Sequence, residues 1–442
     1  MKFTSTRNPG GPAVSFAEAL FQGIAPDGGL YHPVEEPDLR ALIRSLGEDA
    51  SFLDCAGAMI QGLFGDDHTA ETARELARRA FPFEPRLKRL EPGMRLLELF
   101  HGPSCAFKDF GAGFLAAAME WELQRGGQAV PAERTVILTA TSGDTGSAVA
   151  QAFQGRQNID VVILYPSGRV SPLQEKQLTA PSENITALEV KGSFDDCQRM
   201  VKEAFADPEL TGRICLTSAN SINVGRLIPQ SFYYIWAFSQ LKDYAGRELV
   251  FCVPSGNFGN LTAGLLAWRW GMPVSSFIAA TNANDVVPQF LQSGAFTPRP
   301  SVQTLANAMD VGNPSNFERM ERLFGSAQAM AGLISARSVS DQEIQAVMKD
   351  VYEKRGELIC PHTATGVLAA REYLQEDQGE DTLVVPLATA HPAKFVEVSR
   401  DALGVEPPLP ERLARLLEQP KRSVLVENTR EALARELLNR FC

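Results

Sequence analysis

Short apolar runs, several of them followed directly by a helical pattern, recur through most of this chain. They are rich in Val, Ile and Leu, and they occupy residues 135–140, 161–165, 249–253, 277–280 and 383–387. Strands that alternate with helices predict parallel sheets with helices on both faces. Ligands of such sheets bind beyond the carboxyl ends of the strands. The sequence therefore predicts an α/β fold whose chemistry lies in the loops that follow these runs.

The chain has 442 residues, too many for one small core, and its texture changes along its length. Amphipathic helical patterns occupy 14–21 and 70–80, and the proline-spaced stretch 81–92 has the composition of a linker. Helical patterns return at 408–415 and 429–441, and we expect them to pack on the outside. Three domains are predicted: a mainly helical N-terminal domain (1–95), a large α/β domain (96–134 and 228–442) and a small α/β domain (135–227).

Composition argues against several classes of partner. The net charge of −11 and the pI near 5.2 argue against a nucleic-acid binder, which needs a basic face. No stretch is long and apolar enough for a membrane-spanning helix, and the N-terminus lacks the apolar core of a secretory signal. The seven cysteines are scattered without CxxC spacing, and the five histidines have no partner at metal-ligand spacing. We therefore expect a cytoplasmic protein with free thiols, no membrane contact and no metal site.

One lysine has apolar neighbours on both sides. Lys108 follows a segment that contains Cys105 and precedes Phe110. If the segment packs, poor solvation lowers the pKa of the ammonium group. The neutral amine can then form a Schiff base with a carbonyl, such as that of pyridoxal phosphate (PLP). The alternative is a loop lysine ahead of an apolar helix at 114–121, with Asp109 as the N-cap of that helix.

Two loops follow predicted strands and open helical patterns. Residues 254–260 contain Gly256 and Gly259, which let backbone amides approach an anion closely at a helix N-terminus. This loop lacks the Gly-Lys-Ser/Thr ending of a nucleotide P-loop and the GxGxxG dinucleotide spacing. Residues 139–146 hold the same place in the preceding unit, and their hydroxyls and amides suit a carboxylate. Either loop can also be a turn or a helix cap without a ligand.

Two further segments are rich in hydrogen-bonding groups. In residues 218–226, the side chains of Asn220, Ser221 and Arg226 can clamp a second phosphate. The alternative is a polar turn before the next helix. Thr389 follows the last apolar run and can present a hydroxyl at a strand end.

Together these segments resemble the threonine synthase family, PLP enzymes of the tryptophan synthase β fold (fold type II). The resemblance covers essentially the whole chain. Residues 5–7 and 22–31 are similar to the family's opening signature, and residues 100–110 are similar to its PLP-lysine motif. The long N-terminal part and the Ser-Gly-Asp-Thr-Gly loop resemble the longer bacterial and fungal subgroup. Ser104 and Cys105 stand where a Thr and an aliphatic residue are usual, and Ser104 keeps the hydroxyl.

The resemblance implies two parallel-sheet α/β domains, with PLP bound by the large one, and a role for each motif residue. Lys108 is implied to be the catalytic residue, which carries PLP as a Schiff base. The other residues implied to bind the cofactor are Asp144 beside the PLP 3′-oxygen, Thr389 at the pyridine nitrogen, and Gly256, Asn257, Phe258, Gly259 and Asn260 around the phosphate. The residues implied to bind the substrate, O-phospho-L-homoserine, are Ser142 and Thr145 near its carboxylate and Asn220, Ser221 and Arg226 at its phosphate.

The implied reaction converts O-phospho-L-homoserine and water to L-threonine and phosphate, the last step of threonine biosynthesis. It consists of a γ-elimination of phosphate followed by addition of water at the β-carbon. Two alternatives stay open: a phospholyase that degrades the same substrate to 2-oxobutyrate, and a catalytically silent paralogue that only binds PLP. A silent paralogue is expected to lose the lysine or the loops, and both are present. The expected partner is the small-molecule substrate, and the expected assembly is a monomer or a homodimer.

Overall fold

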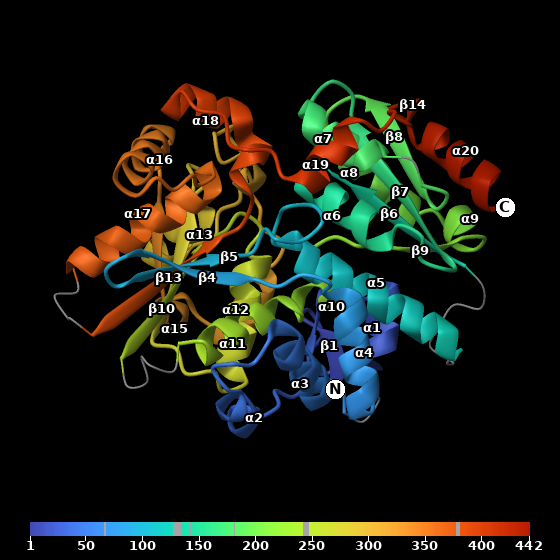
Figure 1. The fold of residues 1–442 in the computed structure, drawn as a ribbon. Helices are drawn as coiled ribbons and strands as arrows, with labels where there is room; N and C mark the ends of the chain where they lie inside the picture. The colour runs from blue at the N-terminus through green and yellow to red at the C-terminus, as the bar shows by residue number, and fades with distance from the viewer. Residues whose placement is uncertain (66–67, 127–133, 142, 181, 242–246, 377–380) are drawn as a thin grey trace. The chain divides into compact units, whose positions relative to one another are not determined.

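The computed structural model describes residues 1–65, 68–126, 134–141, 143–180, 182–241, 247–376 and 381–442, which form two compact units (Figure 1). Unit 1 comprises Met1–Val34, Lys108–Arg226 and Leu409–Cys442, and unit 2 comprises Glu35–Phe107 and Leu227–Pro408. The boundaries of these units differ from those of the three domains expected from the sequence. The domain boundaries stay a prediction. Every helix in these described ranges is too short or too polar to cross a membrane.

A parallel five-stranded sheet is the centre of unit 1, with the strand order β14-β8-β7-β6-β9. Its strands are β6 (Thr135–Ala140), β7 (Ile159–Pro166), β8 (Ile185–Lys191), β9 (Cys215–Thr217) and β14 (Val424–Glu427). One face of the sheet, which includes Leu138 and Leu164, packs against helices in a single core. Met200 of α8 (Phe194–Phe205) and Leu433 of α20 (Arg430–Phe441) are part of this core.

The first residues add a small antiparallel sheet to unit 1, with the order β2-β1-β3. Its strands are β1 (Lys2–Ser5), β2 (Val14–Ser15) and β3 (Tyr31–Pro33). The remaining helices that begin in unit 1 are α1 (Phe16–Gln22), α5 (Lys108–Arg125), α6 (Asp144–Phe153), α7 (Pro172–Thr179), α9 (Pro208–Thr211), α10 (Val224–Leu227) and α19 (Glu411–Leu417).

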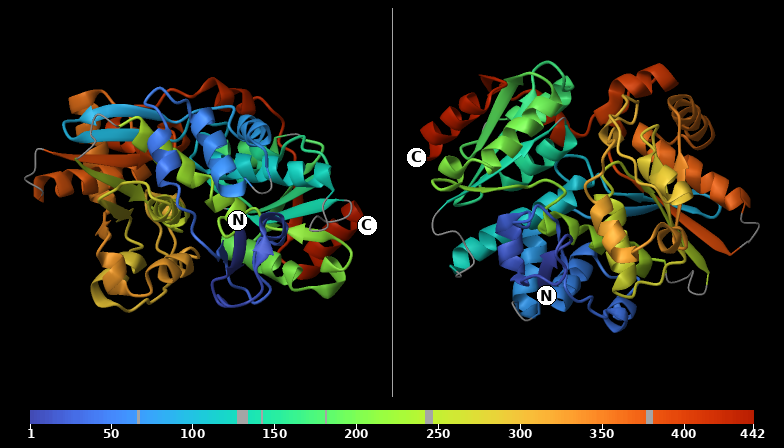
Figure 2. Two further views of the ribbon diagram at one scale, coloured as in Figure 1. Left: turned by 90° about the horizontal axis from the view of Figure 1, so that it is seen from below. Right: turned by 180° about the vertical axis from the view of Figure 1, so that it is seen from behind.

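The C-terminal segment completes the parallel sheet of unit 1. Strand β14 pairs with β8, and Val426 and Leu433 are buried there. Figures 1 and 2 show the red C-terminal helix beside the green strands of this sheet. The large domain predicted from the sequence includes the whole of 228–442, whereas residues 409–442 lie in unit 1. The reason is the pairing with β8, which short and isolated helical patterns do not reveal.

A six-stranded sheet is the centre of unit 2, with the order β12-β11-β10-β13-β5-β4; the β4–β5 pair is antiparallel, and the other pairs are parallel. Its strands are β4 (Arg86–Glu91), β5 (Met94–Glu98), β10 (Glu248–Pro254), β11 (Ser276–Thr281), β12 (Ile334–Ser338) and β13 (Thr382–Ala388). The helices are α2 (Arg40–Ser45), α3 (Phe52–Phe64), α4 (Ala70–Ala80), α11 (Gln230–Ser239), α12 (Gly259–Arg269), α13 (Val286–Ser293), α14 (Phe317–Phe324), α15 (Ala327–Ala331), α16 (Asp341–Arg355), α17 (Pro361–Glu376) and α18 (Val396–Leu403), with 3₁₀ turns η2 (Asn307–Met309) and η3 (Pro392–Phe395).

Alternate side chains of this second sheet face different helices. Ile278 of β11 lies in a core with Val367 of α17. Its neighbour Phe277 and Phe251 of β10 instead contact the Tyr234 ring of α11, with ring centroids 6.2 and 5.0 Å away. The period-two alternation of a strand therefore gives this sheet helices on both faces. Helices on both faces were expected from the alternation of strands and helices in the sequence.

The five strands predicted from apolar runs are all present, as β6, β7, β10, β11 and β13. Three smaller expectations are wrong. The stretch 81–92 is not only a linker, because Arg86–Glu91 pairs with β5. Asp109 is not an N-cap, because α5 already begins at Lys108. The helix expected at 14–21 begins at Phe16, because a capping box between Ser15 and Glu18 sets its start.

Shortening one side chain of α20 tests whether the C-terminal segment is part of the core of unit 1. Leu433 is fully buried, so we expect Leu433→Ala to lower the free energy of unfolding by about 2–5 kcal/mol. Urea unfolding followed by circular dichroism measures the change. Leu417→Ala in α19 is the control, because Leu417 is 42% exposed and should change stability by less than about 0.5 kcal/mol. Equal effects of the two substitutions would contradict this packing.

Candidate functional site

Lys108 lies at the start of a helix and faces a carboxylate from the start of another. Its Nζ is 3.9 Å from Oδ2 of Asp144, the first residue of α6. The Asp144 side chain is 3% exposed and that of Lys108 is 17% exposed. Oδ1 of Asp144 accepts a hydrogen bond of 3.3 Å from Nε2 of Gln174. A helix N-terminus favours negative charge, so the backbone and Lys108 both stabilise the Asp144 carboxylate.

The loop between β6 and α6 is braced by a threonine. Oγ1 of Thr141 accepts hydrogen bonds from the amides of Gly143 and Gly146, at 3.0 and 2.9 Å. These bonds shape the turn that presents Asp144 and the half-buried Thr145 at the beginning of α6. Ser142, predicted to be near the substrate carboxylate, lies outside the described residues.

The predicted clamp for a second phosphate belongs to the same unit. Arg226 is buried, and its Nη1 donates to the carbonyl of Ala219 at 2.7 Å. Burial lowers the pKa of this guanidinium to about 10, and the charge of Asp109 opposes that shift. Arg226 therefore keeps its positive charge at neutral pH. A methyl group on Gly111 would lie 2.6 Å from the Arg226 carbonyl, so glycine permits the close approach of α10 to α5 one turn after Lys108.

The two other residues of this clamp lie in the loop after β9. Oδ1 of Asn220 accepts a hydrogen bond of 2.6 Å from Oγ1 of Thr139, which ties the loop to the end of β6. Ser221 is half-buried. The donors of Asn220 and the charge of Arg226 therefore belong to the same unit as the Lys108–Asp144 pair.

In unit 2, the glycine loop joins β10 to α12 in the way the sequence predicts. The side chain of Asn260 braces the turn, because its Nδ2 donates to the Pro254 carbonyl at 2.8 Å and its Oδ1 accepts from Ser255 Oγ. Phe258 has a left-handed backbone (φ 58°), and α12 begins at Gly259. The first amides of a helix have no partner within the helix and attract anions. This loop therefore fits a phosphate group held by backbone N–H groups.

A separate segment supports the glycine loop from behind. A Cβ atom on Gly256 would lie 2.5 Å from the Cα of Met309, so only glycine allows this approach. Oδ1 of Asn257 accepts from the amide of Ser315 at 2.6 Å, and the Asn257 carbonyl accepts from Nδ2 of Asn316 at 3.2 Å. Sequence reasoning missed these residues, as it missed Gln174, because they lie far along the chain and have no local motif.

Thr389 follows β13, the parallel neighbour of β10, so its loop leaves the same edge of the sheet as the glycine loop. Its carbonyl accepts a hydrogen bond of 2.8 Å from the amide of Phe107, the residue before Lys108. The amide of His391 donates to the Cys105 carbonyl at 3.0 Å, and Ala106 forms an antiparallel bridge to residue 390. The segment that precedes the lysine is therefore paired along the end of β13.

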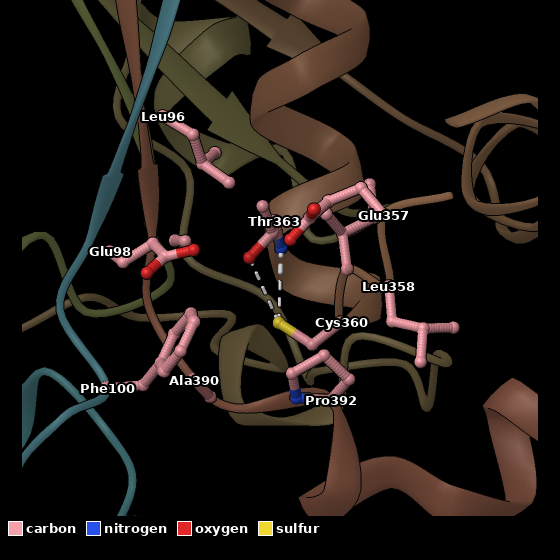
Figure 3. A pocket seen from close by; sticks show the side chains of 11 residues that line it. Leu96, Glu98, Phe100, Glu357, Leu358, Cys360, Thr363, Ala390 and Pro392 are labelled. Carbon is pink, nitrogen blue, oxygen red and sulfur yellow. Dashed lines mark hydrogen bonds between the residues drawn. The ribbon is translucent and has the colours of Figure 1, made fainter. Parts of the chain in front are cut away.

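A small pocket lies on the other side of this strand end (Figure 3). It is lined by Leu96, Glu98, Phe100, Glu357, Leu358, Ile359, Cys360, Thr363, Ala388, Ala390 and Pro392. Sγ of Cys360 is 3.1 Å from Oγ1 of Thr363, and burial raises the pKa of the thiol. Residues 388 and 390 line the pocket but Thr389 does not, as the alternation of an extended backbone requires. The pocket is therefore separate from the face that Thr389 presents.

Comparisons with known proteins agree with these features. The family model described as "Pyridoxal-phosphate dependent enzyme" matches residues 88–389. Models of the threonine synthase N terminus and C-terminal region match residues 2–81 and 363–437. Threonine synthase from Serratia marcescens is 44% identical over 409 residues, with 92% of each chain covered. The chain belongs to the threonine synthase family.

Solved structures give the same result. The crystal structure of threonine synthase from Escherichia coli is 40% identical, with a TM-score of 0.89, and the match covers 99% of this chain and 100% of that one. A PLP-bound threonine synthase from Brucella melitensis is 36% identical, with a TM-score of 0.91 and coverage of 100% and 99%. Maize serine racemase, at 19% identity and a TM-score of 0.53 over 72% of this chain, shares only the fold.

A methyl group on Gly256 tests the tight support of the glycine loop. We expect Gly256→Ala to lower the free energy of unfolding by about 1–3 kcal/mol, because the methyl group would meet the backbone of Met309 and force the loop to move. Urea unfolding measures this change. Gly10→Ala is the control, since nothing lies within 4 Å of the added Cβ. If the two variants were equally stable, the close approach at Gly256 would be wrong.

Proposed function

We propose that this chain converts O-phospho-L-homoserine and water to L-threonine and phosphate, with PLP as its cofactor. Membership of the threonine synthase family supports the reaction. The observation in the chain itself that carries the proposal is the presence of two separate groups suited to phosphate. One is the glycine loop at the N-terminus of α12, and the other surrounds the buried charge of Arg226. A PLP enzyme with a phosphorylated substrate needs both.

The glycine loop is proposed to hold the cofactor phosphate. The backbone amides of Gly256, Asn257, Phe258, Gly259 and Asn260 supply the donors, and α12 adds its dipole. Thr389, at the neighbouring strand end, is proposed to offer its hydroxyl to the pyridine nitrogen. When bound, PLP supplies the electron sink that stabilises negative charge on the substrate carbons.

Lys108 is proposed to tether the cofactor and then to move protons. A lysine displaced by the substrate amine stays nearby and can transfer protons at Cα and Cβ. The amide of Phe107, which donates to the Thr389 carbonyl, belongs to the residue just before the helix that carries this lysine. Asp144, 3.9 Å from Nζ, is proposed to lie beside the cofactor 3′-oxygen and to share charge with both groups.

The substrate is proposed to be held at both of its ends. Arg226 matches the substrate phosphate in charge, and Asn220 and Ser221 add hydrogen-bond donors. Ser142 and Thr145, at the N-terminus of α6, are proposed to bind the carboxylate. This assignment favours elimination of phosphate from Cγ. Arg226 would stabilise the negative charge of the leaving phosphate, and Lys108 would transfer protons at Cα and Cβ.

We also propose a cytoplasmic location and a monomer or homodimer. All seven cysteines lie in the described residues and none forms a disulfide, which suits a reducing compartment.

Removal of the lysine amine tests its role as the tether. We expect Lys108→Ala to abolish the visible absorbance of lysine-bound PLP, because alanine has no amine to form the Schiff base. Absorbance spectra of the purified protein with PLP measure this. Lys349→Ala, a change at an exposed lysine of α16, is the control and should keep the spectrum. An unchanged spectrum in Lys108→Ala would contradict the assignment.

Product analysis tests the reaction itself. The purified protein with PLP and O-phospho-L-homoserine should release L-threonine and phosphate in equal amounts. Chromatography of the amino acids and a phosphate assay measure both products. Release of 2-oxobutyrate, ammonia and phosphate would instead identify a phospholyase, and the absence of any product would identify a silent paralogue.

A further inference from the structure

A fully buried arginine lies behind the glycine loop of unit 2. Arg319 of α14 has no exposed surface, although placing a guanidinium in a protein interior costs several kcal/mol. Its Nη1 donates to Oδ1 of Asn316 at 2.7 Å, and Asn316 is itself fully buried. Burial lowers the pKa of Arg319 to about 9, so the group remains charged at neutral pH. Its hydrogen bond to Asn316 connects the buried charge to a residue that contacts the glycine loop.

Arg319 determines which way the Asn316 amide points. An arginine can only donate hydrogen bonds, so the atom of Asn316 that meets Nη1 must be the oxygen. The nitrogen of the same amide then faces the Asn257 carbonyl, to which it donates at 3.2 Å. A flipped amide would place two donors against each other at Arg319 and two acceptors against each other at Asn257. The guanidinium thus removes the ambiguity of the asparagine side chain.

The direction of the Asn257 carbonyl has a consequence on the other side of the loop. A trans peptide group is planar, and its C=O and N–H point in opposite directions. With the Asn257 carbonyl held toward Asn316, the N–H of Phe258 points away from α14. Phe258 has a left-handed backbone and immediately precedes the first residue of α12. The hydrogen bond from Asn316 to the Asn257 carbonyl therefore also sets the direction of the Phe258 N–H, because both groups belong to one peptide plane.

We propose that Arg319 is a positioning residue that, through Asn316, orients the Asn257–Phe258 peptide so that the Phe258 amide donates to the cofactor phosphate. This inference rests on the proposed phosphate-binding role of the glycine loop. The amide of Ser315, which donates to Oδ1 of Asn257 at 2.6 Å, holds the same residue at a second point. The hydrogen bond to the Asn257 carbonyl opposes rotation of the peptide, and the one to the Asn257 side chain limits movement of the residue.

Asn316→Asp separates positioning from folding. The aspartate still accepts from Arg319 and forms an ion pair with it, which offsets the acceptor placed against the Asn257 carbonyl, so the apoprotein should still unfold cooperatively in urea. It cannot donate to the Asn257 carbonyl, so the dissociation constant for PLP should rise about tenfold, as for a lost hydrogen bond to a charged ligand. Pyridoxal, which lacks the phosphate, should bind with an unchanged dissociation constant. Both ligands are titrated into apoprotein and followed by absorbance.

Arg319→Met and Arg322→Met are the matched pair of arginine variants. Both residues lie in α14, but Arg319 is buried and Arg322 is exposed. Arg319→Met should weaken PLP more than pyridoxal, because the Asn316 amide loses its fixed orientation, whereas Arg322→Met should change neither. An equal loss for both ligands in Asn316→Asp, or an unchanged affinity for PLP, would overturn the positioning role. Failure of the unmodified protein to bind PLP would instead overturn the proposed function.

Discussion

Parallel pairing of β10 with β13 is the constraint on which the arrangement of unit 2 depends. The register aligns Leu249 with Leu383 and Cys252 with Pro386, so both strands end at the same edge. The glycine loop leaves this edge from β10, and the Thr389 segment leaves it from β13. The position of each loop is fixed by the end of its strand, and the residues of the loop alone do not determine it. The hydrophobic run within each strand therefore sets the position of the polar groups beyond it.

In unit 1, too, two loops that follow neighbouring parallel strands leave the same edge of the sheet. Strand β6 lies between β7 and β9, and its end leads into the turn that presents Asp144. The loop after β9 carries Asn220, which is bonded to Thr139 at the end of β6. The helix that begins at Lys108 packs against α6 and thereby brings the amine to the carboxylate. Lys108 and Asp144 thus both lie at helix N-termini, where the backbone stabilises carboxylates and bound anions.

Residues that support the loops are spread along the chain, and they explain why the candidate site was only partly predictable. Lys108, the glycine loop, Asn220 and Arg226 could be proposed as site residues because their residue types and local spacing suit a Schiff base or a bound anion. Met309, Asn316 and Gln174 could not, since nothing in their own surroundings marks them as neighbours of a loop 30 or more residues away in the chain. The placement of the C-terminal strand on β8 was missed for the same reason. Non-local pairing has no sequence period of its own.

The sequence by itself determined the fold class and the five central strands, and it made Lys108 and the loops that suit anions the candidate site. These depend on local periodicity and on residue chemistry, which a single chain shows directly. Only the tertiary structure decided that Lys108 meets Asp144, that β14 completes the sheet of unit 1, and that Arg319 and Asn316 stand behind Asn257. Each of these depends on burial between distant segments. The free energy of that burial comes from the whole core, so it cannot be read from any one stretch of sequence.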